Sequence, residues 1–588
     1  MRANGQVVEI RNHDLRFTLD EIVQYVHRMW PTKLSQSELQ LLEQKTEGWI
    51  AGLQLATLSL RQLDNVQTVL GELTGTNVDI AEYFMDEVLS RQPNIFYQFQ
   101  LRMSILDRFC AALCAAIAPD LDPDWTAEAV LDWLAHGNLF IIPLDAQKVW
   151  YRYHHLYKDL LQSRLLATFN EDEVAELHRR AAKWLAQADF LVQAVNHALT
   201  ASDFDLVEQI IRETLPVILN REDRTVLHRW LNILPETLVN GRPELLMLKV
   251  WSLQYSWQPE VIAGVIKEVE LLLEQEERTQ TASDHRQVLF GQIALFKAQA
   301  AYSGGQATLA VTYSRAAFNL LPTAWILGRG AAVFYLGVSM HALGESFAAE
   351  QMLRDLYEPL AVKANAYGLR ILMALGFNYM AMGRLVQVEQ TANLMLQLAI
   401  ENRLLVAQGW AYLMLGMVYY QWNQLDMAEK QFHKIVDIRY MIHAIAARQG
   451  IAGAILVHQA TGRQAEAWQM WDLLCRYDLE IRGHMNDEAE PLHALLMIAD
   501  DEVENALRWA TAYNKPVDHT LLIMMVLPQL IQSQILMASE DEADISQALQ
   551  LLDEVETVAK LNHVFRRQIE VMALRALALN AMGKKQRL

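Results

Sequence analysis

The residues best suited to chemistry gather in one short stretch, 150–161, which reads WYRYHHLYKDLL. It holds the adjacent histidines His154 and His155 among four aromatic side chains. An imidazole can donate a hydrogen bond, and its charge responds to its surroundings. The stretch therefore either senses a ligand or packs a junction between two parts of the chain, and residue types alone leave both interpretations open.

Other candidate residues are weaker. Cys110 and Cys114 stand four positions apart, but no Cys or His nearby completes a metal site, so we expect buried structural cysteines. Glu47 and the pair Asp487-Glu488 read as ordinary surface charges. Because no Ser/His/Asp or metal-ligand spacing is present, we expect no catalytic residue, no metal and no enzymatic activity.

Composition limits the partners. A formal charge of −20 without a basic stripe argues against direct nucleic-acid binding, which needs clustered Lys and Arg. Three cysteines cannot form a disulfide framework, which is typical of a reducing compartment. The first eleven residues lack the apolar core of a signal peptide, and no run of ~18 apolar residues occurs, so no membrane span is expected. These features predict a cytoplasmic protein.

The elements that precede the histidine stretch mix strand and helix signals. Residues 6–10 alternate as a short strand. Thr18 and Glu21 have the spacing of a capping box, which predicts a helix start, and a second start follows at Ser35. Residues 48–56 form a nearly continuous apolar run, which predicts a largely buried helix.

The stretch itself belongs to a predicted β-hairpin. The apolar run 139–144 and the alternating run 149–153 flank a polar turn. Helices followed by a hairpin are typical of a winged-helix domain. Residues 124–136 carry Asp and Glu but no Lys or Arg, so we do not expect this domain to read DNA.

From residue 171 onward the sequence predicts repeated helix pairs. Small residues recur at intervals of 39, 39, 40, 39, 39 and 42: Ala310, Ala349, Val388, Ala428, Ala467, Ala506 and Ala548. Five positions before each stands an expected turn residue: Gly305, Gly344, Gly383, Asn423, Gly462, Asp501 and Ala543. Glycine and asparagine suit a turn that requires positive φ.

Glycines also mark where paired helices should cross closely, at Gly337, Gly376 and Gly416. This register resembles that of tetratricopeptide (TPR) repeats with a lengthened period. An irregular helical bundle would not keep the spacing over six intervals. The same register puts Gly583 at the next turn position, so the last repeat is expected to be incomplete.

Several blocks carry a resemblance to a known family: residues 6–10 with 15–18, 45–60 and 103–110, continuing through 139–161 and 178–184 into the repeats. Together they resemble the MalT-like (LuxR-family) ATP-dependent transcriptional regulators, a branch of the STAND NTPases. The resemblance implies a P-loop NTPase, a winged-helix segment, a TPR-like sensor superhelix and a C-terminal helix-turn-helix. It also implies that inducer and ATP promote self-association.

Two parts of that plan are missing from the sequence. No Gly-x-x-x-x-Gly-Lys-Ser/Thr motif occurs, so the phosphates of ATP or ADP have no cradle and no nucleotide cofactor is expected. No helix-turn-helix follows the repeats. We therefore expect a regulator that lacks the N-terminal NTPase core and the C-terminal DNA-binding module.

The resemblance also assigns two residues. His154 matches the histidine of the family's Met-His-Asp motif, which contacts the β-phosphate of ADP, and His155 replaces the acid. His154 is then a nucleotide-sensing relic or simply a packed histidine. The segment Gly52-Leu53-Gln54-Leu55 matches the family's Gly-Leu-Pro-Leu motif, in which the proline lies near the adenine. Gln54 stands in place of that proline, so the sequence departs from the motif at the residue that would contact the adenine.

The predicted protein is mostly α-helical. Residues 1–75 form a helical remnant of the NTPase module, 76–170 a winged-helix-like domain with a small hairpin, and 171–588 the TPR-like superhelix. We predict the sensor and oligomerisation portion of a MalT-like regulator, which binds an inducer or a protein or peptide partner in the superhelix groove and can self-associate. The alternative is a free-standing TPR scaffold for protein–protein interaction.

Overall fold

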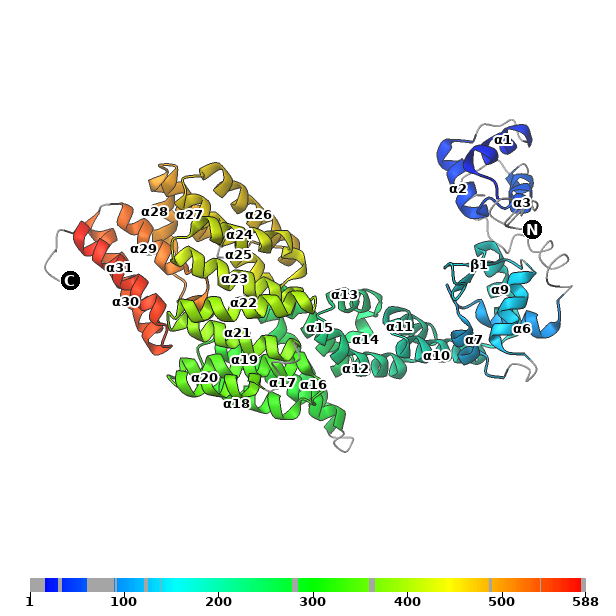
Figure 1. Cartoon of the computed structure of the whole chain (residues 1–588), viewed down its shortest axis with the longest axis horizontal. Coiled ribbons are helices and arrows are strands. Elements are labelled where there is room, and N and C mark those ends of the chain that lie inside the picture. Colours follow the sequence, from blue (N-terminus) through cyan, green and yellow to red (C-terminus); the bar gives the residue numbers. More distant parts are fainter. Residues whose placement is uncertain are drawn as a thin grey trace, which may run out of the picture. The chain divides into compact units, whose positions relative to one another are not determined.

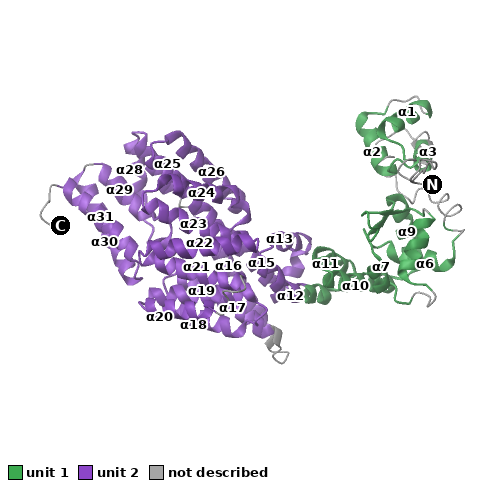
Figure 2. Ribbon diagram, viewed as in Figure 1, with its two compact units in different colours: residues 1–210 green, residues 211–588 purple. Residues whose placement is uncertain are grey.

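The computed structural model describes residues 16–29, 34–60, 89, 92–120, 125–137, 139–277, 284–358, 365–485, 489–539 and 541–582. The chain forms two compact units, Met1–Ile210 and Ile211–Leu588, which Figure 2 colours separately. The predicted strand 6–10 and the turn at Gly583 lie outside the described residues. The predicted boundaries after residues 75 and 170 stay predictions. Within the described ranges, no helix is long and apolar enough to cross a membrane.

Unit 1 contains helices around one small hairpin. Its elements, labelled in Figure 1, are α1 (Leu19–Met29), α2 (Gln36–Thr46), α3 (Ile50–Leu60), α6 (Asn94–Met103), α7 (Ala111–Ile117), α8 (Ala127–His136), β1 (Ile141–Pro143), β2 (Tyr151–Tyr153), α9 (His155–Thr168), α10 (Glu171–Gln187) and α11 (Leu191–Thr200).

The predicted helix starts of unit 1 are confirmed. Thr18 and Glu21 exchange capping contacts at the start of α1, with the Thr18 amide donating to the Glu21 carboxylate at 2.8 Å. Ser35 closes a full capping box on α2. Cys110 and Cys114 are buried as expected. Cys114 lies inside α7, whereas Cys110 is the N-cap residue of that helix and has an extended backbone.

The predicted hairpin is also confirmed. β1 and β2 pair antiparallel with Ile141 opposite Tyr153 and Pro143 opposite Tyr151. Phe109 extends this pairing, since its amide and carbonyl both bond to Tyr151 at 2.8 Å. β2 runs directly into α9, so the hairpin fixes where the histidine pair begins that helix.

Unit 2 is a stack of antiparallel helix pairs. Its elements are α12 (Phe204–Asn220, which begins in unit 1), α13 (Arg224–Ile233), α14 (Glu236–Asn240), α15 (Pro243–Ser256), α16 (Pro259–Glu277), α17 (Asp284–Ser303), α18 (Ala307–Leu320), α19 (Ile326–Ala342), α20 (Ser346–Tyr357), α21 (Ala366–Ala381), α22 (Leu385–Glu401), α23 (Leu405–Gln421), α24 (Leu425–Asp437), η5 (Arg439–Met441), α25 (Ala444–Ala460), α26 (Gln464–Arg482), α27 (Ala489–Ala499), α28 (Val503–Ala512), η6 (Thr520–Ile523), α29 (Pro528–Ala538), α30 (Glu542–Leu561) and α31 (Phe565–Ala581).

The repeat register predicted from the small residues matches this stack. All seven of those residues are fully buried, each near the start of the second helix of its pair. The turn residues from Gly305 to Asp501 all have positive φ, between 57° and 85°. The seventh turn prediction, Ala543, is wrong: Asp541 caps α30, so the helix begins early and Ala543 lies in its first turn.

The crossing glycines are confirmed as sites of close helix approach. A Cβ atom at Gly337 would lie 2.9 Å from Leu353, one at Gly376 2.6 Å from Met414, and one at Gly416 2.4 Å from Phe432. Contacts this short leave no room for a side chain, which explains why glycine recurs there.

The segment between α28 and α29, residues 513–527, is not part of a helix pair. It runs along the first helices of the pairs, which we call the inner helices (α15, α17, α19, α21, α23 and α25). We call this segment the strap. Gln449 accepts hydrogen bonds from the amides of Met525 and Val526 at 2.9 and 3.1 Å. The buried guanidinium groups of Arg566 and Arg567 each donate to the Met524 carbonyl at 2.7 Å. The strap is thus fixed from α25 on one side and from α31 on the other.

Candidate functional site

The histidine predicted as a nucleotide contact caps helix α9 and is buried. His154 is 3% exposed. Its Nε2 lies 3.1 Å from the Thr46 carbonyl, so Nε2 carries the proton and donates it there. Burial is the main cause that lowers the pKa of His154 to about 4, which leaves the ring neutral near pH 7. Its Nδ1 has no hydrogen-bond partner among the described residues, and in this tautomer it offers a lone pair.

The neighbouring carboxylate of Glu47 joins the histidine pair to the rest of the junction. Arg152 donates to both of its oxygens at 2.8 and 2.9 Å, His155 donates from Nδ1 at 3.0 Å, and Arg16 approaches to 3.4 Å. Burial alone would raise the pKa of Glu47. The hydrogen bonds from His155 and Arg152 outweigh it and hold that pKa well below its usual range.

This cluster has the composition of a metal site, because the ligand atoms of Glu47, His154 and His155 lie within 4.8 Å of one another. Both Glu47 oxygens already bind the Arg152 guanidinium, so a metal cation would have to displace this positively charged group. A second group with metal-ligand composition consists of Glu429, His433 and His458 in unit 2. Its carboxylate is likewise already paired, because Arg463 donates to both Glu429 oxygens at 2.9 and 2.7 Å.

Gln54 and His154 differ in their surroundings. Gln54 projects from α3 with an exposed side chain, and its carbonyl accepts from Thr57 at 2.9 Å. Trp49 lies just before α3 and packs edge-on against His154, with ring centroids 5.9 Å apart. A Cβ at Gly52 would lie 2.4 Å from the Trp49 ring. The 46–56 block and the histidine pair therefore meet, although the assigned roles of His154 and Gln54 stay predictions.

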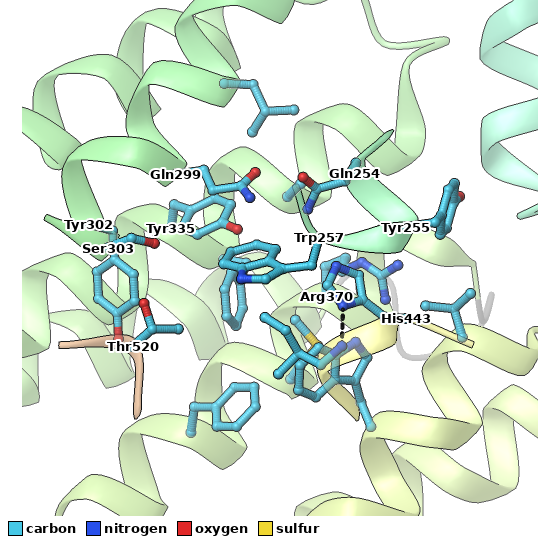
Figure 3. A pocket seen from close by; sticks show the side chains of 18 of the residues that line it. Gln254, Tyr255, Trp257, Gln299, Tyr302, Ser303, Tyr335, Arg370, His443 and Thr520 are labelled. Carbon is cyan, nitrogen blue, oxygen red and sulfur yellow. Dashed lines mark hydrogen bonds between the residues drawn. The ribbon is translucent and has the colours of Figure 1, made fainter. Parts of the chain in front are cut away.

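A pocket that the sequence did not indicate lies on the inner helices of unit 2 (Figure 3). Its volume is about 110 Å³. The walls come from α15, α17, α19, α21, α23 and α25, and the strap covers one side with Thr520, Ile523 and Met524. The aromatic lining residues are Trp251, Tyr255, Trp257, Phe296, Tyr302, Phe334, Tyr335, Phe377 and Trp410.

The pocket rings touch across successive helices. Phe377 lies 5.9 Å from Phe334 and 5.6 Å from Trp410, measured between ring centroids. Trp410 and Trp257 both pack on His443, at 5.5 and 5.6 Å. Because aromatic rings are large and rigid, this lining gives the pocket a defined apolar surface.

One end of the pocket is polar. Arg370 is 8% exposed and its Nη2 donates to Glu222 at 2.8 Å. The other Glu222 oxygen accepts from the Val406 amide at 3.1 Å. Burial, followed by the charges of Arg370 and Arg224, lowers the pKa of His443 to about 3, so His443 is neutral.

Comparison with known proteins identifies the family. Residues 291–587, half of the chain, match the model of the MalT-like TPR region. The chain belongs to the MalT-like family. Residues 85–173 also match the MalT winged helix domain. These are winged-helix and helical-repeat regions, and neither is a catalytic domain type.

Two curated relatives place the MalT-like chain among larger proteins. It is 27% identical over 447 residues to the HTH-type transcriptional regulator MalT of Yersinia pestis, which is 74% of this chain and 48% of that protein. It is 31% identical over 277 residues to the serine/threonine-protein kinase PknK of Mycobacterium tuberculosis, which is 46% of this chain and 24% of the kinase. The chain thus spans less than half the length of either relative.

Among solved structures, the chain is similar to a Signal Transduction ATPase with Numerous Domains (STAND) protein with a tetratricopeptide repeat sensor from Pyrococcus horikoshii. The match has a TM-score of 0.44 and 13% identity, and it covers 95% of this chain and 75% of that one.

Sequence reasoning placed the histidine junction but missed the pocket. The pocket residues are spread from Trp251 to Met524 and form no local motif. The available signal was indirect: Trp, Tyr and Phe recur on the first helices of the repeats, but apolar residues also build the core there.

Proposed function

We propose that this chain is the sensor portion of a MalT-like regulator and that its TPR superhelix binds an inducer in the aromatic pocket. The supporting observation is the pocket itself, which combines an apolar aromatic lining with buried polar groups at one end. Small-molecule sites in proteins typically have this composition.

The pocket can be tested by filling it. Ala331 lines the pocket on α19, so Ala331→Trp is expected to occupy the space without removing a polar group. A metabolite library is screened by thermal shift against the wild-type chain and this variant. Compounds that raise the Tm of the wild type but not of Ala331→Trp support the proposal. Equal shifts in both proteins, or no shift with any compound, would refute it.

We also propose that the inducer is sensed without nucleotide binding by these 588 residues. The sequence holds no P-loop motif, and the Nε2 proton of His154 is already donated to Thr46. Calorimetry with ATP and with ADP is expected to give no micromolar binding. Micromolar binding that disappears in His154→Ala would contradict this and assign the histidine a sensing role.

A free-standing scaffold for protein partners is the second candidate. The observation that favours it is a row of exposed apolar side chains, Phe565, Ile569 and Met572, on one face of α31. A pull-down distinguishes the two: a protein or peptide partner that binds the wild type but not Ile569→Glu, without any small-molecule response, would favour the scaffold, whereas self-association alone would not.

A further inference from the structure

The polar end of the pocket holds hydrogen-bonding groups that the protein leaves unsatisfied. Arg370 uses Nη2 for Glu222, whereas its Nη1 is buried without a partner among the described residues. The same holds for the hydroxyl of Tyr255 and for Oε1 of Gln254. Buried polar atoms are almost always paired, so several orphans in one pocket indicate a missing partner.

Two of these groups are donors. A guanidinium has no acceptor atom, so Arg370 Nη1 can only donate. Burial, together with the negative charge of Glu222, raises the pKa of Tyr255 well above its usual value, so its hydroxyl keeps its proton. A partner for these two donors must supply acceptor oxygens, whereas the third group, Oε1 of Gln254, needs a donor, which a carboxylate does not have.

Two guanidinium groups and two carboxylates, those of Arg370, Arg224, Glu222 and Asp223, act on the Tyr255 hydroxyl. Arg224 lies 5.0 Å above the Tyr255 ring, and its Nη1 donates to the carbonyls of Tyr440 and Ile442, which carry no net charge. Glu222 is engaged by Arg370, and Asp223 accepts from the first amides of α13. Guanidinium groups bind carboxylates in paired, charge-assisted contacts.

The pocket is of a size for one ring at most. Its whole volume, about 110 Å³, is below that of the engineered cavity of ~150 Å³ that holds one benzene molecule. Trp257, in the left-handed conformation at the end of α15, lies in the middle of the labelled side chains in Figure 3, and its ring packs on His443. A ring against Trp257 would therefore lie next to His443, a residue that is close enough to Arg370 for the guanidinium charge to lower its pKa.

We propose that the pocket selects a small aromatic carboxylate, with its ring between Trp257 and Trp410 and its carboxylate on Arg370 and Tyr255. This inference rests on the proposed inducer pocket and specifies its ligand class. The aromatic walls supply affinity through buried area, and the two donors supply the preference for an acid.

The test uses a matched pair of probes, 3-phenylpropionate and its neutral amide, measured by calorimetry and by quenching of tryptophan fluorescence. The carboxylate is expected to bind at least tenfold more tightly than the amide, because a charge-assisted hydrogen bond exceeds a neutral one by about that factor. Ala331→Trp is expected to abolish binding of both probes.

Variants assign the donors. Tyr255→Phe keeps the ring and removes the hydroxyl, and it is expected to weaken binding of the carboxylate several-fold and binding of the amide less, because the amide oxygen is uncharged. Arg370→Gln alone would leave the buried Glu222 carboxylate without its charge partner, so it is combined with Glu222→Gln. This double variant is expected to bind the acid no more tightly than the amide. Arg384→Gln, half-exposed and paired with Glu350 outside the pocket lining, is the control and should bind like wild type.

The outcomes separate this inference from the proposed function. Equal affinity for the two probes overturns the preference for an acid but not the inducer pocket. The same conclusion follows if neutral library compounds raise the Tm of the wild type and 3-phenylpropionate does not. A peptide that binds the wild type but not Ala331→Trp overturns the ligand class in the same way. No binding by any compound overturns both proposals.

Discussion

The glycine at the crossing of α23 and α24 gives a quantitative test of the repeat packing. A Cβ at Gly416 would lie 2.4 Å from Cε1 of Phe432, a fully buried ring. Replacing glycine by alanine inside a helix gains about 1 kcal/mol of helix propensity. Overpacking a filled contact costs about 1–3 kcal/mol.

The cost should exceed the gain at this position. Gly453 bounds the same ring on another side, since a Cβ there would lie 2.5 Å from Phe432 Cζ, so the ring cannot move away. We therefore expect Gly416→Ala to destabilise unit 2 by about 2 kcal/mol, the upper overpacking cost less the propensity gain.

Gly264 provides the matched control. It lies inside helix α16, and no atom stands within 4 Å of the position that an alanine Cβ would take, so Gly264→Ala should gain up to about 1 kcal/mol. Urea unfolding is followed by circular dichroism, and midpoints are compared because a repeat array need not unfold in two states. Amide exchange in α23 and α24 locates the change. If Gly416→Ala were as stable as Gly264→Ala, the close crossing would be refuted.

Two further predictions concern buried charge. The side chains of Arg448 and Asp478 are 3% and 0% exposed and bond to each other at 2.8 Å, so Asp478→Ala should lower the free energy of unfolding by about 3–5 kcal/mol, measured by thermal unfolding. The double variant Arg448→Met with Asp478→Leu should recover most of this lost stability. No difference in stability between the single and double variants would contradict this. Folding lowers the pKa of His443 from 6.5 to about 3, so the folded state resists protonation of this ring. The contribution of His443 to the free energy of unfolding is therefore fully present above about pH 6.5 and is lost as the pH falls toward 3. The loss amounts to about 2 kcal/mol at pH 5. His443→Asn retains a capping side chain and should reduce the loss of stability between pH 6.5 and 5 by about that amount, leaving the loss due to other buried histidines such as His341. An unchanged slope would argue against a neutral buried His443.

Much of the repeat architecture was predictable because its signals are local and periodic. Turn residues such as Gly305 and Asn423 need positive φ, and buried positions such as Ala310 tolerate only small side chains, so the sequence repeats at the period of the structure. The prediction failed at Ala543, where an N-cap at Asp541 starts α30 early relative to the buried Ala548. A cap is a single side-chain hydrogen bond, which periodicity does not register.

The sites were less predictable, for different reasons. The histidine junction is visible in the sequence because its residues are contiguous, but the partner that fixes its polarity, Glu47, is 105 residues from Arg152 and reads in the sequence as a surface charge. The pocket depends on pairs such as Arg370 and Glu222, separated by 148 positions. No local pattern marks such a pair, since each residue alone resembles any surface charge.

The strap has a consequence for how the protein is made. The pocket lining runs from Trp251 to Met524, and the strap supplies its last part. At a synthesis rate of about 5–20 residues per second, the first wall leaves the ribosome roughly 14–55 s before the last. During that interval the aromatic side chains of the early helices have no strap against them. If the pocket binds an inducer as proposed, a nascent chain would therefore lack a complete site until the strap has been synthesised, and ligand present during translation would act only on nearly completed molecules.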